Sequence, residues 1–326
     1  MYFIITIDTE EDQWSNYTRD GQTLENIESI PKLQSLFEKY GARPTYFISY
    51  PVATDPKSID IFKDIAELKK GEIGAHCHPW NTPPFIEKIN TQSSMLCNLE
   101  PDLQYKKLKS LTDTIKENIG VTPVSFRAGR WGYNSDVAIN LFKLGYQTDS
   151  SLTPFMNWEI FSGPDLSSSP QTPFFFNPER PLEQNKNGSM LQVPVSIGFN
   201  RNCFQLSHQF YSMVEKNKWS KKIFIGGLSR LGILKKYWLS PENSTSEDMV
   251  SLIRILQKKG YKYFNFMFHS NSLLPGKTPF VRTSDELNNF IERIETVLAY
   301  AVRHDFQFTT LSEIRSRLQE DRRENV

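Results

Sequence analysis

Short β-branched and aromatic runs alternate with amphipathic stretches along almost all of this 326-residue chain. Runs 2–7 and 263–269 have the length and composition of buried strands. Segments 25–40 and 103–119 carry apolar residues at helical spacing. Such alternation predicts a parallel sheet, because two parallel strands are joined by a crossover that is usually a helix. About seven strand–helix units fit an α/β fold with one distorted (β/α) barrel.

The middle of the chain interrupts this alternation. Residues 152–188 are rich in Pro, Ser and Phe, most densely at 172–178. Residues 200–240 have the weakest pattern, with a helix expected near 206–217 and an apolar run at 223–234. We find no linker and no internal repeat. We therefore expect one domain over 1–326, with an irregular insertion around 152–240.

Composition and charge limit which partners the protein can bind and in which compartment we expect it. The net charge of +1 argues against a nucleic acid held by bulk charge. No window has the length and apolarity of a membrane span. The first residues lack a signal-peptide pattern, so we expect a cytoplasmic protein. Its three cysteines, Cys77, Cys97 and Cys203, share no metal-binding spacing, which favours a reducing compartment without disulfides.

Polar side chains stand directly after several of the expected strands. These strand ends are Asp8, His76 with His78, Arg127, Asp149 and His269. In a barrel the carboxyl ends of the strands converge on one site. The first strand adds Glu10 and Asp12 at alternate positions, and an extended chain would point them to the same side as Asp8. The sequence therefore predicts one polar site at this end of the barrel.

The two histidines suggest a metal site. His76 and His78 share one face of an extended chain, and Pro79 favours an extended conformation at His78. Two imidazoles and one carboxylate from a neighbouring strand make a three-ligand site with an open position, which is typical of catalytic zinc. The residues leave open whether Asp8 or Glu10 supplies that carboxylate.

Five blocks of sequence carry a family resemblance. They are 6–10, 71–76, 126–127, 145–151 and 268–270, the last with Leu273 nearby. In this order they resemble the polysaccharide deacetylases of the NodB-homology type, carbohydrate esterase family four. The resemblance covers most of the chain and thins over 155–260. It implies the distorted barrel of the glycoside hydrolase/deacetylase type and the removal of N-acetyl groups from sugars.

The resemblance also implies roles for single residues. Carried over by position, these are Asp8 as catalytic base, Glu10, His76 and His78 as ligands of a divalent metal, Arg127 as the group that holds Asp8, His269 as general acid, and Asp149 as the residue that tunes His269. In such enzymes water held by the metal attacks the amide carbonyl. The metal is expected to be zinc, with cobalt or nickel as alternatives.

The chain departs from the family pattern at three points. Asp8-Thr9-Glu10 replaces an adjacent Asp pair, so Asp8 itself is an alternative ligand. The second histidine is His78, two positions after His76. In the family it usually stands four positions after the first histidine, where this chain has Trp80. The loop 127–132 replaces the usual Arg-Pro-Pro-Tyr. These changes resemble those of a divergent branch associated with bacterial surface-glycan synthesis.

We expect a metal-dependent hydrolase that removes the acetyl group from an acetylated sugar or glycan precursor. Two alternatives remain: a C–N hydrolase for a non-sugar amide, and a catalytically silent barrel that binds a glycan or a partner. Trp80, Arg130, Trp131 and Leu273 are the candidate substrate-binding residues. Trp158 and 174–176 are further candidates for the cleft, and packing in the core is the alternative for each aromatic residue.

Overall fold

The sheet that organises the molecule follows the order β10-β1-β2-β3-β4-β5-β7-β6. Its strands are β10 (Tyr263–His269), β1 (Tyr2–Thr9), β2 (Thr45–Ile48), β3 (Glu72–Cys77), β4 (Ser125–Ala128), β5 (Thr148–Asp149), β7 (Met190–Gln192) and β6 (Phe174–Phe176). The computed structural model describes residues 1–14, 17–216 and 234–324. Within them, every pairing on this path is parallel except that of β6 with β7. The expected parallel sheet of about seven strands is confirmed.

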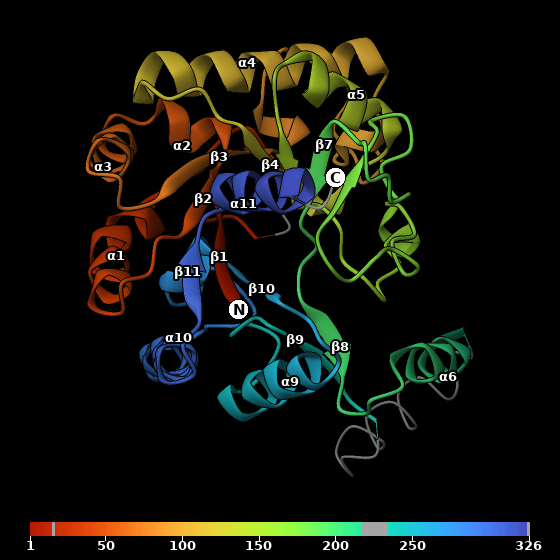
Figure 1. Ribbon diagram of the computed structural model, residues 1–326. Coiled ribbons are helices and arrows are strands. Elements are labelled where there is room, and N and C mark those ends of the chain that lie inside the picture. Colours follow the sequence, from red (N-terminus) through yellow and green to blue (C-terminus); the bar gives the residue numbers. More distant parts are fainter. Residues whose placement is uncertain (15–16, 217–233, 325–326) are drawn as a thin grey trace.

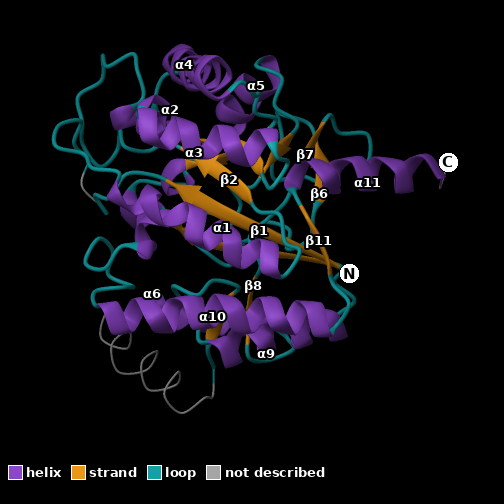
Figure 2. Cartoon of the chain, turned by 90° about the vertical axis from the view of Figure 1, so that its left-hand side faces the viewer, coloured by secondary structure: helices purple, strands orange, loops and turns teal. Residues whose placement is uncertain are grey.

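Helices surround the curled sheet (Figure 1). They are α1 (Ile30–Lys39), α2 (Tyr50–Thr54), α3 (Pro56–Glu67), α4 (Pro101–Ile119), α5 (Ser135–Lys143), α9 (Ser246–Lys258) and α10 (Ser284–Arg303). In the view turned by 90°, α4 and α5 lie on one side of the sheet and α9 and α10 on the other, and α1 crosses in front of the strands (Figure 2). Among the described helices, none combines the length and apolar character that a membrane span requires.

Strand β1 shows how alternation divides the barrel into two environments. Phe3, Ile5 and Ile7 belong to the large core between strands and helices. Ile4 faces the interior, where it joins a second apolar cluster. Asp8, on the same face as Ile4, lines a cavity. The interior is therefore apolar near the start of β1 and polar at its end, because side chains two apart share a face.

The barrel closes irregularly between β7 and β10. Single hydrogen bonds bridge this gap: Ser196 N donates to Asn265 O (3.2 Å), and Met267 N donates to Leu239 O (3.0 Å). Leu239 directly follows β9 (Lys236–Trp238), which pairs with β8 (Ile197–Phe199) in a separate two-stranded sheet. A distorted rather than regular barrel follows from this closure.

The amino-terminal end of the barrel is filled by the last helix, α11 (Leu311–Glu324). Its Leu311 and Ile314 pack against Ile4 and Phe47. The preceding strand β11 (Gln307–Thr309) pairs with the first half of β1, whereas β2 pairs with the second half. Because this end is packed, the polar end of the strands is the open one.

The middle of the chain differs in part from expectation. Residues 174–176 form the edge strand β6 and are buried, so they are not part of the cleft. The expected helix near 206–217 is α6 (Phe204–Lys216). The predicted apolar run 223–234 lies almost wholly outside the described residues. Helix α9 begins with a capping box, in which Thr245 is the cap and Asp248 its partner.

Candidate active site

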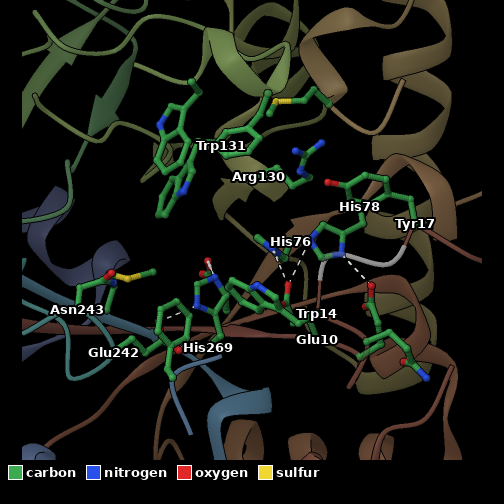
Figure 3. Close-up of a pocket in the computed structure, with 18 of the residues that line it drawn as sticks. Glu10, Trp14, Tyr17, His76, His78, Arg130, Trp131, Glu242, Asn243 and His269 are labelled. Atoms are coloured by element: carbon green, nitrogen blue, oxygen red, sulfur yellow. Dashed lines mark hydrogen bonds and ion pairs between the residues drawn. The ribbon is translucent and has the colours of Figure 1, made fainter. Parts of the chain in front are cut away.

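A cavity of about 410 Å³ lies at the carboxyl ends of the strands. Its lining includes most of the residues predicted from the strand ends: Asp8, Glu10, His76, His78 and His269. They come from β1, β3 and β10 and from residues directly after them. Figure 3 shows Glu10, His76 and His78 together on one side of the cavity, with His269 nearby. The tertiary fold thus brings the predicted strand ends into one place.

Glu10, His76 and His78 form a group whose ligand atoms lie within 4.8 Å of one another. Glu10 Oε2 is 3.4 Å from His76 Nε2 and 3.2 Å from His78 Nε2. Ligands about 2.0–2.1 Å from a tetrahedral zinc ion lie roughly 3.3 Å apart. These distances, and the mixture of one carboxylate and two imidazoles, fit a divalent metal of the zinc type.

Each histidine of this group is held by its other ring nitrogen. His76 Nδ1 hydrogen bonds to the carbonyl oxygen of Arg127 (3.0 Å), and His78 Nδ1 pairs with the Glu11 carboxylate (3.1 Å). Trp80 stacks on the His78 ring, with centroids 4.2 Å apart. Such contacts orient imidazoles so that Nε2 is left for a metal. Both imidazoles are therefore already oriented to bind a metal through Nε2.

The groups of this site set one another's charge. Burial opposes a charge on Glu10, but the hydrogen bond to His76 and the charge and hydrogen bond of His78 hold the pKa of Glu10 well below its usual value. Burial likewise disfavours a charged His78, but the carboxylates of Glu11 and Glu10 outweigh it and raise the pKa of His78 to about 10. A metal ion and a proton therefore compete for the His78 imidazole.

Asp8 lies beside the metal group but has a different partner. Arg127 Nη1 donates to Asp8 Oδ1 at 2.7 Å, and both side chains are buried. The guanidinium is itself fixed, because its Nε donates to Ser150 O and its Nη2 to Thr6 Oγ1. A charged pair inside a protein persists when its remaining donors are also satisfied. Arg127 thus holds one oxygen of Asp8 and leaves Oδ2 toward the cavity.

His269 faces Asp8 from β10. Its Nε2 is 3.6 Å from Asp8 Oδ2, while its Nδ1 pairs with Glu242 Oε2 at 2.9 Å. Glu242 also accepts from the His269 backbone N–H and from Ser272 Oγ. Burial lowers the pKa of His269, but the Glu242 carboxylate more than offsets this and the result is a pKa of about 9.

The contact expected between Asp149 and His269 is therefore a wrong prediction. Asp149 instead accepts hydrogen bonds from Ser151 and from Gln192 Nε2 (2.6 Å). Burial raises its pKa to about 6. Strand β5 lies on the far side of β4 from the β1–β10 pair, so Asp149 holds the loop after β5. The carboxylate beside His269 is Glu242.

Most, but not all, of the candidate substrate-binding residues line the cavity. Trp80, Arg130 and Trp131 line the cavity, as does Trp158, whereas Leu273 is buried and not part of the lining. Arg130 and Trp131 have φ angles of 54° and 62°. Residues other than glycine rarely adopt this left-handed region, which costs about 1–2 kcal/mol per residue. Both side chains line the cavity, and strained backbone of this kind clusters at functional sites in proteins.

Two carboxylates of the site carry weak signals in the sequence. Glu242 follows β9 in a Pro-containing loop and belongs to no pattern that we recognise. Glu11 is adjacent to Glu10, but β1 ends at Thr9, and the chain then turns. For the same reason Asp12 does not share the cavity with Asp8. It accepts from the backbone N–H groups of Glu25 and Asn26 and fixes the turn before α1.

Neither a family model nor a curated protein matches this sequence. Solved structures do match its fold. One, from Mycobacterium smegmatis and assigned provisionally as a polysaccharide deacetylase, has 14% identity and a TM-score of 0.56 over 98% of this chain and 91% of that one. Another, from Parabacteroides distasonis and assigned provisionally as a glycoside hydrolase/deacetylase, has 11% identity and a TM-score of 0.62 over 98% and 71%.

A third match has a different kind of activity in its name. It is a 4-alpha-glucanotransferase from Thermococcus litoralis, with 9% identity, a TM-score of 0.55, and coverage of 97% of this chain and 40% of that one. One barrel thus carries more than one reaction, so function is argued from the site. The arrangement of sheet and helices is nevertheless clear: this chain has the NodB-type fold of the polysaccharide deacetylases.

Proposed function

We propose that the protein is a divalent-metal-dependent hydrolase that removes the acetyl group from an N-acetylated amino sugar. One observation carries the proposal. The Glu10, His76 and His78 group shares its cavity with an Arg-held carboxylate, Asp8, and a carboxylate-held histidine, His269. Three ligands with an open position, a base and an acid are the parts that amide hydrolysis needs.

The residues of the metal group would hold the cation through Glu10 Oε2 and the Nε2 atoms of His76 and His78. A bound cation supplies a Lewis acid that polarises the amide carbonyl and lowers the pKa of water. Glu11 and the Arg127 carbonyl keep the two imidazoles in the orientation that leaves Nε2 available. The protein's part here is to bind and to orient.

Asp8 is placed to take a proton from the attacking water. Its Oδ1 is occupied by Arg127, and its Oδ2 faces the cavity. In hydrolysis the water oxygen joins the carbonyl carbon and its proton passes to the base. The C–N bond then breaks, and the acyl group leaves as acetate. A carboxylate held within reach of that proton is a suitable base.

His269 is placed to supply the proton that the leaving amine needs. With a pKa of about 9, the imidazole is protonated at neutral pH. Its Nδ1 donates to Glu242, so the second N–H, at Nε2, points toward Asp8 and the cavity. The protonated His269 ring therefore lies opposite the Asp8 carboxylate. Its transferable proton is on Nε2, the ring nitrogen that faces the cavity.

The direct test combines metal content with turnover. The purified protein is stripped with a chelator, reloaded with zinc, cobalt or nickel, and assayed for acetate release from N-acetylglucosamine oligosaccharides. We expect one metal ion per chain and activity that returns only with metal. A protein that binds no divalent metal, or that binds one and cleaves neither N-acetylated sugars nor simple amides, would not be an enzyme of this kind.

Replacing Glu242 by Gln is expected to shift the pH profile. Glu242 raises the pKa of His269 to about 9, and removing its charge lowers that pKa. Since the acid must be protonated, kcat/KM of the native protein should fall as pH rises through about 9, and that of the variant should fall at lower pH. The measurement is kcat/KM against pH. Asp149→Asn is the comparison and should leave this limb in place; an unchanged limb in Glu242→Gln contradicts the assignment.

A further inference from the structure

One wall of the cavity is almost wholly apolar. It faces the metal group and consists of Met95, Trp131, Met156, Trp158, Phe161 and Trp238. Figure 3 shows Trp131 across the cavity from His76 and His269. The Trp131 ring lies 5.4 Å from the Arg127 guanidinium, so this apolar wall begins beside the group that holds Asp8. Whatever fills the cavity therefore touches both an acid–base site and a hydrocarbon-like surface.

The rings of the apolar wall pack against one another rather than standing singly. Trp131 stacks on Trp158 with centroids 6.3 Å apart and lies 6.5 Å from Trp238, and Trp158 lies 6.4 Å from Phe161. The Trp158 Nε1 donor is already used by Thr153 Oγ1. Sugar recognition needs polar groups beside the ring faces. This wall offers two thioethers, the Trp131 and Trp238 N–H groups and the already bonded Trp158 N–H, which are few polar groups for a sugar.

The apolar wall continues out of the cavity onto the surface. Phe161, which lines the cavity, is 47% exposed, and its neighbour Ile160 is 77% exposed. Both lie in the 3-10 turn η5 (Glu159–Phe161). Two hydrogen bonds hold this turn: Phe161 N donates to Trp158 O (2.8 Å), and Asn98 Nδ2 donates to Ser162 O (2.7 Å). The turn therefore extends the apolar lining of the cavity to the protein surface.

The opposite wall carries the charged groups. It presents the Glu10 group, Asp8 and His269, with the Trp14 ring packed edge-on against His269. Arg130 instead lies beside Trp131 (Figure 3). A ligand that satisfies both walls is polar at the reacting amide and apolar along one extension. A sugar ring can stack its C–H face on an indole. The hydroxyl groups around its edge, however, find no partner in the thioethers of Met95 and Met156 or in the exposed Ile160 side chain.

We propose that the substrate is amphiphilic: an N-acylated amino sugar bearing a hydrocarbon chain that lies along the apolar wall and leaves the cavity past Phe161 and Ile160. This rests on the proposed function for the reaction and adds the class of substrate. The chain is attached either at the glycosidic oxygen, with acetate as the acid released, or as the acyl group itself, in which case the same hydrolysis releases the longer fatty acid. Both positions are next to the reacting amide.

Binding and turnover of four compounds test this, with the zinc-loaded protein and with each ligand below its micelle concentration. They are methyl and octyl glycosides of N-acetylglucosamine, N-octanoylglucosamine, and the N-acetylated trisaccharide. Tryptophan fluorescence, read directly after mixing, reports binding at the wall. We expect one octyl compound to bind about tenfold or more tightly than the methyl glycoside, as burial of two or more methylene groups gives.

The octyl compound that gains affinity identifies where the chain is attached. Equal binding of all four, or tightest binding of the trisaccharide, overturns the proposal. Ile160→Ser with Phe161→Ser should remove most of the octyl preference, whereas Phe142→Ser, at a 50% exposed site on α5, should keep it. A preference that survives in the former variant also overturns it. If the octyl preference is present but no compound is cleaved, the proposed hydrolysis is wrong, while the amphiphilic class of ligand is supported.

Discussion

Replacing Asp8 by Asn is expected to reduce turnover roughly 10²–10⁴-fold, the range that a general base contributes, while a full complement of metal stays bound. Asn keeps the shape of Asp and can still accept from Arg127 Nη1, but it cannot take a proton from water. Asp8 is not a member of the Glu10, His76 and His78 group. The measurements are kcat and metal content per chain.

Two other acids of the same stretch serve as comparisons. Glu10→Gln should lose metal and activity together, because Glu10 Oε2 lies close to both histidine nitrogens. Asp12→Asn should keep both and show only reduced stability, since Asp12 fixes the turn before α1. If Asp8→Asn loses its metal while Glu10→Gln keeps it, Asp8 is the carboxylate ligand and the roles proposed here are exchanged.

Replacing Gly129 by Ala is expected to weaken metal binding by roughly 100-fold, the upper end of what disturbed supporting groups cause. A Cβ at this position would lie 2.1 Å from His78 Cδ2 and 2.7 Å from the Cys77 carbonyl oxygen. The carbonyl belongs to strand β3, so the His78 ring must move instead. Competition with a chromophoric chelator measures the affinity for zinc.

Gly132→Ala provides a matched control in the same loop. Its Cβ would meet Leu96 N at 2.9 Å, which strains the backbone but touches no member of the metal group. Both variants should therefore unfold at lower temperature, and only Gly129→Ala should lose affinity for the metal. Equal loss in both variants would mean that general destabilisation, rather than displacement of His78, weakens the site.

Much of the barrel was predictable because its signals are local. The apolar runs at 2–7 and 263–269 became β1 and β10, and their alternation placed Asp8 and His269 at the open end. His76 and His78 were predicted on one face, and they do converge on one carboxylate. Strand periodicity is a property of neighbouring residues, so it can be read without knowing the fold.

The errors fell where position depends on distant contacts. The strand β6 lies in a segment that we took for loop, and its Phe side chains pack against β7 rather than the cavity. Asp149 ends a strand as Asp8 does, yet only two residues of β5 pair, and its carboxylate is used by the loop that follows. A polar residue at a strand end is thus a candidate for this kind of site, but the strand end does not by itself place the residue in it.

The opening stretch illustrates the division between sequence and fold. By itself the sequence determined that β1 would carry Asp8 and Glu10 out of an apolar core, since alternation and hydrophobicity are local. Only the tertiary structure decided their partners: Arg127 for Asp8, two histidines for Glu10, and Glu242, 27 residues before its histidine, for His269. Those pairings depend on how the barrel curls and closes, because charges interact through space and not along the chain.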